Sequence, residues 1–518
     1  MLRPKQRTAQ TITVTAPVGG WNAVSSLAGM NPSEAVIMDN WFCLPTELMI
    51  HRGYSEWATG MTGSVKSFLA YDSQTGSHKF FAVSGTGGAY SIYDTSAEGA
   101  VGTAVVIGLT GGDFKYQLTS NGTSSFCMAV NGVDNALLYD GTTWHSLTQT
   151  STPYKIQGVD SYKLCNVRLH KHRMWFIERD SLHCWYLDTD AVSGTAHSYD
   201  FGPLFAHGGK IANIETWTLD AGWGMDDYFV VITTSGEIAV FSGTDPSNPD
   251  NWQLQGVYYV GSPVGTNNTL KYGGDVLLLN KDGLIPLSQC LMSSRVSIKT
   301  SITNKIQQRI TDATSAYENN YGWQVVLYPP ANMLFINVPI SSTQSEQYVM
   351  NTITGSWSRF TNVNAVCWIF INEELYFGLD GKVYLFWDGQ SDNGAMINTD
   401  LLPAFSSFGN QAQQKRFNMC RISMGYDVSF AFNSRIALNF DQTTSPDTPY
   451  TAPQTNVALW DTATWDNAIF GGSIMPYSSW QSAQGIGYYA SYRIRTSSNK
   501  SDIRYYATDY LLEAGGTI

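Results

Sequence analysis

A two-stranded motif recurs seven times in this chain, at residues 80–94, 126–140, 174–188, 228–243, 275–288, 333–351 and 374–388. Each copy is an apolar run rich in β-branched or aromatic residues, a short turn and a second apolar run, which is typical of an antiparallel hairpin. Consecutive copies start roughly 40 to 60 residues apart, close to the length of one propeller blade. The repeat therefore predicts a mainly β protein built around a β-propeller of seven blades, with six blades as the alternative.

Three tryptophans support this spacing. A polar turn precedes each of Trp144, Trp252 and Trp357, which lie roughly two blade lengths apart. In a propeller the outer strand of a blade follows such a turn, and its large ring covers the seam with the neighbouring blade. An aromatic platform for sugars is the functional alternative, and we favour packing.

Length and composition predict two flanking regions. A chain of 518 residues exceeds the capacity of one hydrophobic core, and its 47 glycines with only 14% charged residues favour turn-rich β structure over disorder. We predict an N-terminal extended arm and lead-in over residues 1–63, the propeller over 64–390, and a β-sandwich-like C-terminal domain over 391–518. Within that domain, alternating runs in 421–441 and 488–512 predict two hairpins.

One segment inside the repeat region has a helical pattern. Ile302, Ile306 and Ile310 recur every four residues within 301–319, which gives one apolar stripe, and Ser301 or Thr303 is available as the N-cap. A helix inserted there is either a plug packed on the propeller or an assembly contact. The sequence leaves both readings open.

The charge balance argues against a protein that grips nucleic acid. Lys and Arg number 30 against 42 Asp and Glu, a net charge of −12, whereas binding through phosphates needs a basic face. An acidic wall would let DNA slide past, although ordinary solubility charge explains the same balance. The sequence has no apolar run long enough for a transmembrane helix or a secretory signal, so we expect a protein made soluble inside a cell.

Two groups of carboxylates are candidates for a catalytic site. The turn 140–144 approaches a sialidase-type motif, but its Asp and Gly are adjacent, and an ordinary Asp-Gly turn explains it. Sugar hydrolysis needs two carboxylates across the scissile bond, and the only adjacent pair is Asp226 and Asp227. Neighbouring residues at a strand start point to opposite faces, so we favour a solvated turn there.

The histidines and cysteines are candidates for metal ligands or reactive groups, and a structural role is favoured for them too. His170 and His172 could bind a metal from one strand face, but no carboxylate or cysteine is spaced to complete a site, and an exposed strand end is the favoured reading. No nucleophile elbow, phosphate loop or zinc-protease motif occurs, so we expect no enzyme, cofactor or metal. Scattered cysteines without a CxxC pair predict buried thiols in a reducing compartment: Cys43, Cys127, Cys165, Cys184, Cys290, Cys367 and Cys420.

Residues 19–53 carry the most specific pattern in the chain. A Gly-Gly pair is followed by Met-x-Pro-x-x-Ala-Val, by Asp-Asn, by a proline-containing turn and by Arg-Gly. This pattern resembles the N-terminal signature of tail nozzle proteins (tail hub or packaged-DNA stabilisation proteins) of short-tailed bacteriophages. The family usually has glycine after the turn proline, where this chain has Thr46 and Glu47. The matching residues are Gly19, Gly20, Met30, Pro32, Ala35, Val36, Asp39, Asn40, Pro45, Arg52 and Gly53.

Each matching residue type also has a scaffold role of its own. Asp39 and Asn40 can form side-chain-to-backbone turns, Pro45 fixes a bend, and Gly53 permits a positive φ. The signature is therefore expected to be structural.

The resemblance implies a non-catalytic virion component. Such proteins form a homo-oligomeric ring, a homohexamer in the family, beneath the portal and its adaptor protein, with tail fibres or spikes docked outside. Genomic DNA is retained by the ring and passes through its lumen without sequence-specific binding during ejection. The implied location is the virion tail, after synthesis in the bacterial host cytoplasm, with host envelope contact only during infection. The rival readings are a β-propeller glycan hydrolase or depolymerase and a carbohydrate-binding lectin.

Overall fold

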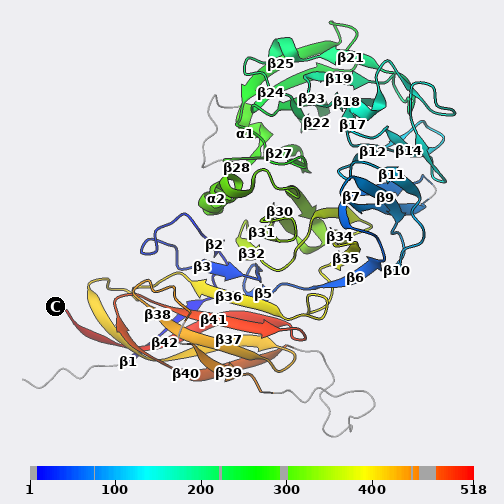
Figure 1. Ribbon diagram of the computed structural model, residues 1–518. Helices are drawn as coiled ribbons and strands as arrows, with labels where there is room; N and C mark the ends of the chain where they lie inside the picture. Colours follow the sequence, from blue (N-terminus) through cyan, green and yellow to red (C-terminus); the bar gives the residue numbers. More distant parts are fainter. Residues whose placement is uncertain are drawn as a thin grey trace, which may run out of the picture.

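The computed structural model describes residues 9–74, 76–220, 225–291, 301–444, 447–453 and 474–517. Within these residues seven sheets surround a common axis as propeller blades, and a two-sheet sandwich lies beside them (Figure 1). The protein is therefore mainly β, with the seven-bladed propeller that the repeat predicts.

The first four blades each have four antiparallel strands, placed in chain order from the axis outward. Blade 1 is β7 (Ser64–Asp72), β8 (His78–Thr86), β9 (Ala89–Asp94) and β11 (Val106–Leu109). Blade 2 is β12 (Lys115–Ser120), β13 (Ser125–Val130), β14 (Leu137–Tyr139) and β15 (Trp144–Ser146). Blade 3 is β17 (Leu164–His170), β18 (Arg173–Glu178), β19 (His183–Tyr186) and β21 (His197–Asp200). Blade 4 is β22 (Ile211–Asp220), β23 (Met225–Thr233), β24 (Glu237–Gly243) and β25 (Trp252–Tyr259).

Blade 6 keeps this plan, whereas blades 5 and 7 depart from it, and a short parallel pair, β16 (Ile156–Gln157) with β20 (Gly194–Thr195), lies outside the blades. Blade 5 has β26 (Thr269–Tyr272), β27 (Asp275–Asn280) and β28 (Gly283–Pro286). Blade 6 has β29 (Gln324–Tyr328), β30 (Met333–Pro339), β31 (Ser345–Asn351) and β32 (Trp357–Phe360). Blade 7 has β33 (Cys367–Ile371), β34 (Glu374–Leu379), β35 (Lys382–Phe386), β6 (Tyr54–Thr59) and the short β10 (Gly99–Ala100).

Each repeated hairpin of the sequence forms the second and third strands of a blade, and the second strand is buried on both faces. On β8, Phe81 and Val83 pack against blade 2, whereas Phe80 and Ala82 pack against blade 7. Side chains alternate along a strand, so a strand between two blades has to be apolar at nearly every position. This is why the repeat is so legible in the sequence.

Strand β6 closes the ring, because it adds the fourth antiparallel strand to blade 7. It belongs to the segment predicted as a lead-in, 1–63, so that segment contributes to the propeller as well as preceding it. Pairing the start of the chain with its last blade joins the two ends of the blade array.

The sandwich combines both ends of the chain. One sheet contains β3 (Glu34–Asp39), β36 (Ile397–Pro403), β41 (Ala490–Ser498), β38 (Ala431–Leu438) and β39 (Thr448–Thr451), with β2 (Gly20–Trp21) on β3, and it continues blade 6 through β32. The facing sheet contains β4 (Trp41–Cys43), β5 (Leu48–Ile50), β42 (Ile503–Thr517), β37 (Gln413–Tyr426), β40 (Met475–Gly487) and β1 (Ala9–Thr15). One apolar core lies between the sheets and reaches blades 5 and 6.

The two predicted hairpins of the C-terminal domain are wrong, although their strands exist. β37 pairs with β40 and β42, whereas β38 pairs with β39 and β41. Likewise β41 and β42 lie in opposite sheets. In both cases the short connection crosses the sandwich, because the apolar faces of the two strands pack on each other across the core instead of forming one surface.

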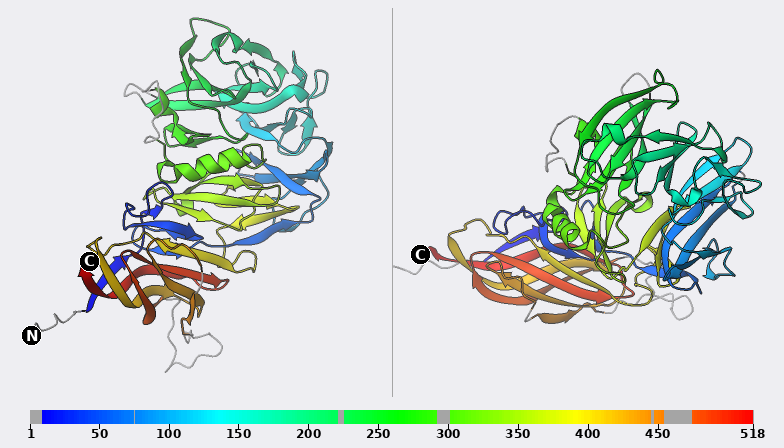
Figure 2. Two further views of the ribbon diagram at one scale, coloured as in Figure 1. Left: turned by 60° about the vertical axis from the view of Figure 1, so that its left-hand side comes forward. Right: turned by 45° about the horizontal axis from the view of Figure 1, so that its top comes forward.

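The predicted helix is present as α2 (Gln307–Tyr317), after a short 3-10 turn, η4 (Asn304–Ile306), and apart from the five-residue α1 (Leu287–Leu291). Ile306 and Ile310 are fully buried, and α2 lies between the blades and the N-terminal strands (Figure 2). The predicted N-cap is wrong: Ile306 occupies that position without a side-chain cap. The hydroxyls of Ser301 and Thr303 bond instead to the backbone of Leu284.

Candidate functional site

The signature segment joins the propeller to the sandwich. Asn40 is fully buried with a φ of 62°, and its side chain accepts from the Thr361 N–H at 2.7 Å. It also donates to the Thr361 hydroxyl at 2.9 Å and to the carbonyl of Asn398 at 2.6 Å. One amide thus holds together β3, the end of blade 6 and the sandwich strand β36; we call residues 34–53 and their partners the junction.

Three signature glycines are sites of close approach. A Cβ on Gly19 would lie 2.7 Å from the carbonyl oxygen of Ser33, and one on Gly20, whose φ is +86°, would lie 2.6 Å from the Trp357 nitrogen. At Gly53 the distance to the Ser391 carbonyl oxygen would be 1.8 Å. The expected reason for Gly53 is wrong, because its φ is not positive and lack of space is what requires glycine there.

Asp39 and Pro45 also act through long-range contacts. The Arg359 side chain donates to both carboxylate oxygens of Asp39, at 2.8 and 2.6 Å, which ties β3 to β32. Pro45 lies in the turn between β4 and β5, and Glu47 of that turn bonds Arg504 on β42 at 2.7 Å. Neither Thr46 nor Glu47 has a positive φ, so the turn works without the family's glycine.

The remaining signature residues divide by exposure. Met30 and Ala35 are buried, Val36 is half-buried, and Pro32 and Arg52 are exposed. The buried and half-buried residues therefore serve packing, whereas Pro32 and Arg52 lie at the surface.

The carboxylate candidates do not converge. Asp140 accepts from the Thr142 and Thr143 N–H groups, each at 2.8 Å, as in an ordinary Asx turn. Burial would raise the pKa of Asp140, but these donors and His145 hold it well below its usual range. Asp227 accepts from the Thr218 hydroxyl at 2.6 Å, and the side chain of Asp226 lies outside the described residues.

The two histidines point to different environments. His170 is buried beside Phe229 and bonds the Thr216 hydroxyl through Nδ1, whereas His172 is exposed and lies 3.0 Å from Asp190. The expected exposed strand end is thus right for His172 only. Burial lowers the pKa of His170 to about 4. Among the described residues there is no group of three or more His, Cys, Asp or Glu placed to bind a metal.

The cysteines that can be described are unpaired and nearly all buried. Burial raises the pKa of Cys43 to about 12 and that of Cys165 to about 11, so neither thiol is activated. Cys290 has its side chain outside the described residues. No helix in the described ranges is long and apolar enough to cross a membrane.

Side-chain hydrogen bonds also join neighbouring blades, and the sequence pattern did not predict them. Asn166 on β17 donates to Asn213 on β22 at 2.9 Å, and Asn213 donates to Thr269 on β26 at 2.7 Å. Ser67 on β7 donates to the Gly112 carbonyl in the connection to blade 2, and Gln324 on β29 donates to the Trp368 carbonyl on blade 7. Their spacing follows the blade repeat, and that spacing is the signal that could have revealed them.

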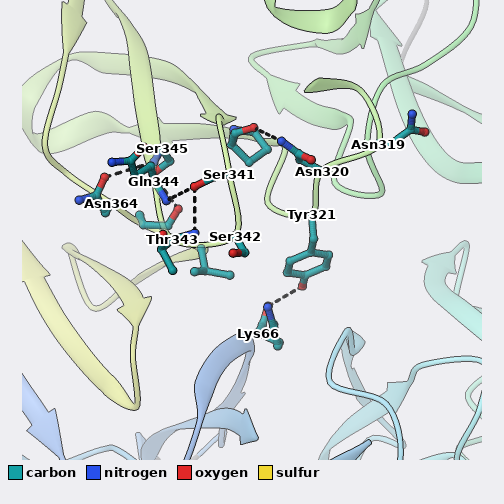
Figure 3. Close-up of a pocket in the computed structure, with 13 residues that line it drawn as sticks. Lys66, Asn319, Asn320, Tyr321, Ser341, Ser342, Thr343, Gln344, Ser345 and Asn364 are labelled. Carbon is teal, nitrogen blue, oxygen red and sulfur yellow. Dashed lines mark hydrogen bonds between the residues drawn. The ribbon is translucent and has the colours of Figure 1, made fainter. Parts of the chain in front are cut away.

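Two cavities border the innermost strands of the blades. One cavity, of about 180 Å³, is lined mainly by hydroxyl and amide side chains, with the 341–345 loop on one side and Tyr321 and Lys66 on the other (Figure 3). The other, of about 740 Å³, lies where β17 and β22 end. A third cavity, of about 140 Å³, is lined by residues of the innermost strands, among them Lys66, Lys115 and Arg168.

Comparison with known proteins identifies no family. The sequence matches no protein-family profile and no curated protein. Among solved structures, YCF48 bound to D1 peptide is 10% identical with a TM-score of 0.36, over 65% of this chain and 97% of that one. The Cps50 (Swd1) propeller domain of Myceliophteria thermophila is 12% identical with a TM-score of 0.35, over 64% and 99%.

A third similar solved structure is that of an enzyme. A family 43 arabinoxylan arabinofuranohydrolase from Bacillus subtilis, in complex with cellotetraose, is 10% identical with a TM-score of 0.24, over 88% of this chain and 95% of that one. At these scores the likenesses support no argument about what this chain does.

Proposed function

We propose that the chain is a structural subunit of a short bacteriophage tail, in which copies form a ring or tube that retains the packaged genome and conducts DNA during ejection. The observation that carries this proposal is that the sheet containing β42 ends in two bare edges. β1 bonds β42 on one side and β40 bonds β37 on the other, and within the described residues no strand covers the outer edge of either.

Both edges lack charged residues, and only β40 has other forms of the usual edge protection, one proline and one register shift against β37. Monomeric proteins cover edge strands or place Lys, Pro or bulges on them, because an open row of N–H and C=O groups recruits another strand. Neither β1, AQTITVT, nor β40, MPYSSWQSAQGIG, has a charged residue, and Pro476 stands near the start of β40. Trp480 and Ile486 on β40 are also exposed. These edges are suited to pairing with another chain.

The strand directions fit a head-to-tail ring of identical chains. β1, β42, β37 and β40 are antiparallel at each step, so β1 and β40 run in opposite directions. If a neighbouring copy is rotated about an axis roughly along the strands, its β1 meets β40 as an antiparallel partner. A contact between two different surfaces closes into a ring when the rotation divides a full turn. In the resembling family the ring has six copies.

The junction is consistent with this role. Glycines, an asparagine and an aspartate of the signature fix the propeller to the sandwich, which would hold the propeller outside the tube wall as a rigid body. Portal adaptor, fibres or spikes would dock on these rings, and the virion tail is the proposed location. The net charge of −12 suits a wall past which DNA moves without binding.

A charge-swap experiment tests assembly. Thr11 on β1 and Ser482 on β40 lie in one row of the sheet and are exposed, so across the contact they would face each other. We expect the T11R/S482R pair to stay monomeric and the T11R/S482E pair to assemble, as judged by light scattering and electron microscopy with the adaptor present. Thr123→Arg, on an exposed propeller turn, is the control.

A wild-type chain that stays monomeric at high concentration with its adaptor would refute the proposal. Release of sugars from glycans that is lost in Asp226→Asn or Asp227→Asn would favour the hydrolase instead.

A further inference from the structure

The largest of these three cavities differs from its surroundings in charge. About 740 Å³ in volume, it lies among blades 3, 4 and 5. Three cations line it, Lys171 and Arg173 from blade 3 and Lys271 from blade 5, against two acids, Asp227 and Asp245. This reverses the balance of the whole chain, in which acids exceed Lys and Arg by 12.

Both acids already serve the fold. Asp227 accepts the Thr218 hydroxyl at 2.6 Å. Asp245 accepts the N–H of Ser247 at 3.1 Å and its hydroxyl at 2.7 Å, which is an Asx turn. Hydrogen bonds from Ser247 and the charge of Arg173 together lower the pKa of Asp245, so it stays ionised while engaged.

Arg173 has donors to spare. Its side chain is 15% exposed and lies over the Tyr186 ring at 5.8 Å. Among the described contacts it makes one long hydrogen bond, 3.4 Å to the Leu187 carbonyl, with Asp245 at 3.7 Å and Asp188 at 3.9 Å. A guanidinium has five N–H donors, and most of these have no close acceptor. An oxyanion in the cavity would satisfy them.

The rim of the cavity is held in place. Lys171 and His172 form the turn between β17 and β18 with φ values of 45° and 63°, the geometry of a tight two-residue hairpin turn. This fixes the backbone that carries Lys171 at the mouth. Thr189 and Thr244 add hydroxyls to the lining that can bond to sugar or phosphate oxygens, whereas the Thr216 hydroxyl already bonds His170 and the Leu169 carbonyl.

We propose that this cavity binds a phosphate monoester carried on a sugar-sized group. Arginine and lysine are the side chains that recognise phosphate, and the volume lies in the range for one small ligand. A DNA duplex presents its phosphates on a convex surface about 20 Å wide, which a concave pocket at a strand turn cannot follow. The cavity of about 180 Å³ has Lys66 as its one cation among the described lining residues (Figure 3).

Calorimetric titration of the full chain with glucose 6-phosphate, glucose and inorganic phosphate tests this. Glucose 6-phosphate should bind, inorganic phosphate more weakly, and glucose without measurable heat. Arg173→Gln and Lys271→Gln should each weaken binding of glucose 6-phosphate at least tenfold. Lys281→Gln, an exposed cation of blade 5 that pairs with Glu318 outside the cavity, should leave it unchanged.

Three results would overturn the proposal. These are no binding of glucose 6-phosphate, equal binding by both Gln variants and wild type, and equal binding of glucose and glucose 6-phosphate. Lys271 is exposed, so its variant keeps the test valid if Arg173→Gln fails to fold.

Discussion

The propeller and the sandwich bury similar strands but are assembled in different ways. Blades 1 to 6 each form from a continuous stretch of chain, and only blade 7 includes strands from elsewhere, β6 and the short β10. In the sandwich, β1 and β5 near the start of the sequence pair with β42 at its end. The propeller is thus largely a product of local sequence, and the sandwich of contacts between remote segments.

The two regions also differ in what joins their parts. Between blades the contacts are mainly apolar clusters, such as the one in which Trp175 and Trp252 stack at 5.5 Å. The junction and sandwich add ionic pairs to their apolar core, such as Arg359 with Asp39 and Arg493 with Asp400. Apolar packing tolerates exchange of similar side chains, whereas a buried polar contact fails when one partner is lost.

The largest expected effect is at Asn40. Asn40→Ala would leave the Thr361 N–H and the Asn398 carbonyl without their partner and place alanine at a φ of 62°, so we expect a loss of about 5 kcal/mol. Amide exchange measured by mass spectrometry should rise across 34–53 and 397–403, with blades 2 to 4 unchanged. Uniform faster exchange over all blades would contradict the contrast between the two regions.

The sequence predicted most of the propeller and little of the sandwich, for a physical reason. A strand between two blades is apolar on both faces, so residues 80–94 can be read without knowing their neighbours. In the segment 488–512 alternation indicates strands, but nothing local states whether they pair or face each other. The same limit applies to Asn40 and Gly53. Thr361, which bonds Asn40, lies 321 positions further along the chain, and Ser391, which packs on Gly53, lies 338 positions further. The sequence pattern indicates that these residue types matter, but it does not predict which residues they contact.

The next largest effect is a loss of stability in the propeller, on substitution of Trp252. Trp252 stacks on Phe241 at 5.2 Å and on Trp175, and it is nearly fully buried. Trp252→Ala should cost about 4 kcal/mol and raise exchange in blades 3 and 4 but not in the sandwich. The equivalent Trp144 is half-buried, so Trp144→Ala is the matched control and should cost about 1 to 2 kcal/mol. Equal losses would show that burial does not decide these positions.

A buried histidine in each region allows a direct pH comparison. Burial lowers the pKa of His51 at the junction and of His170 in the propeller to about 4 in both cases. The folded pKa is depressed, so the unfolded chain takes up the proton first. Stability is complete above pH 6.5 and falls toward pH 4, by about 3 kcal/mol for each residue.

The variants His51→Phe and His170→Phe should each remove this loss in their own region alone. Exchange at pH 5 compared with pH 7 measures the effect, with the unaltered histidine as the internal control. A variant that protects both regions would mean that they unfold as one unit.

The smallest expected effect is a gain in stability, at Asp392, which lies where the chain passes between the propeller and the sandwich. Asp392 is buried next to Tyr54, its Oδ1 has no partner among the described residues, and burial raises its pKa to about 7. With the folded pKa raised, its favourable contribution is complete below pH 3.8 and is lost as the pH rises through 7. The shift corresponds to about 4 kcal/mol at pH 8, but a buried amide keeps part of the desolvation cost, so Asp392→Asn should stabilise the protein by about 2 kcal/mol at pH 8 and have little effect at pH 4. The exposed Asp388, changed to Asn, should give no such pH dependence even though it bonds Ser55 at 2.7 Å. If thermal unfolding of Asp392→Asn matched the wild type at both pH values, the carboxyl would have to be hydrated, and the link between propeller and sandwich would be looser than its backbone bonds indicate.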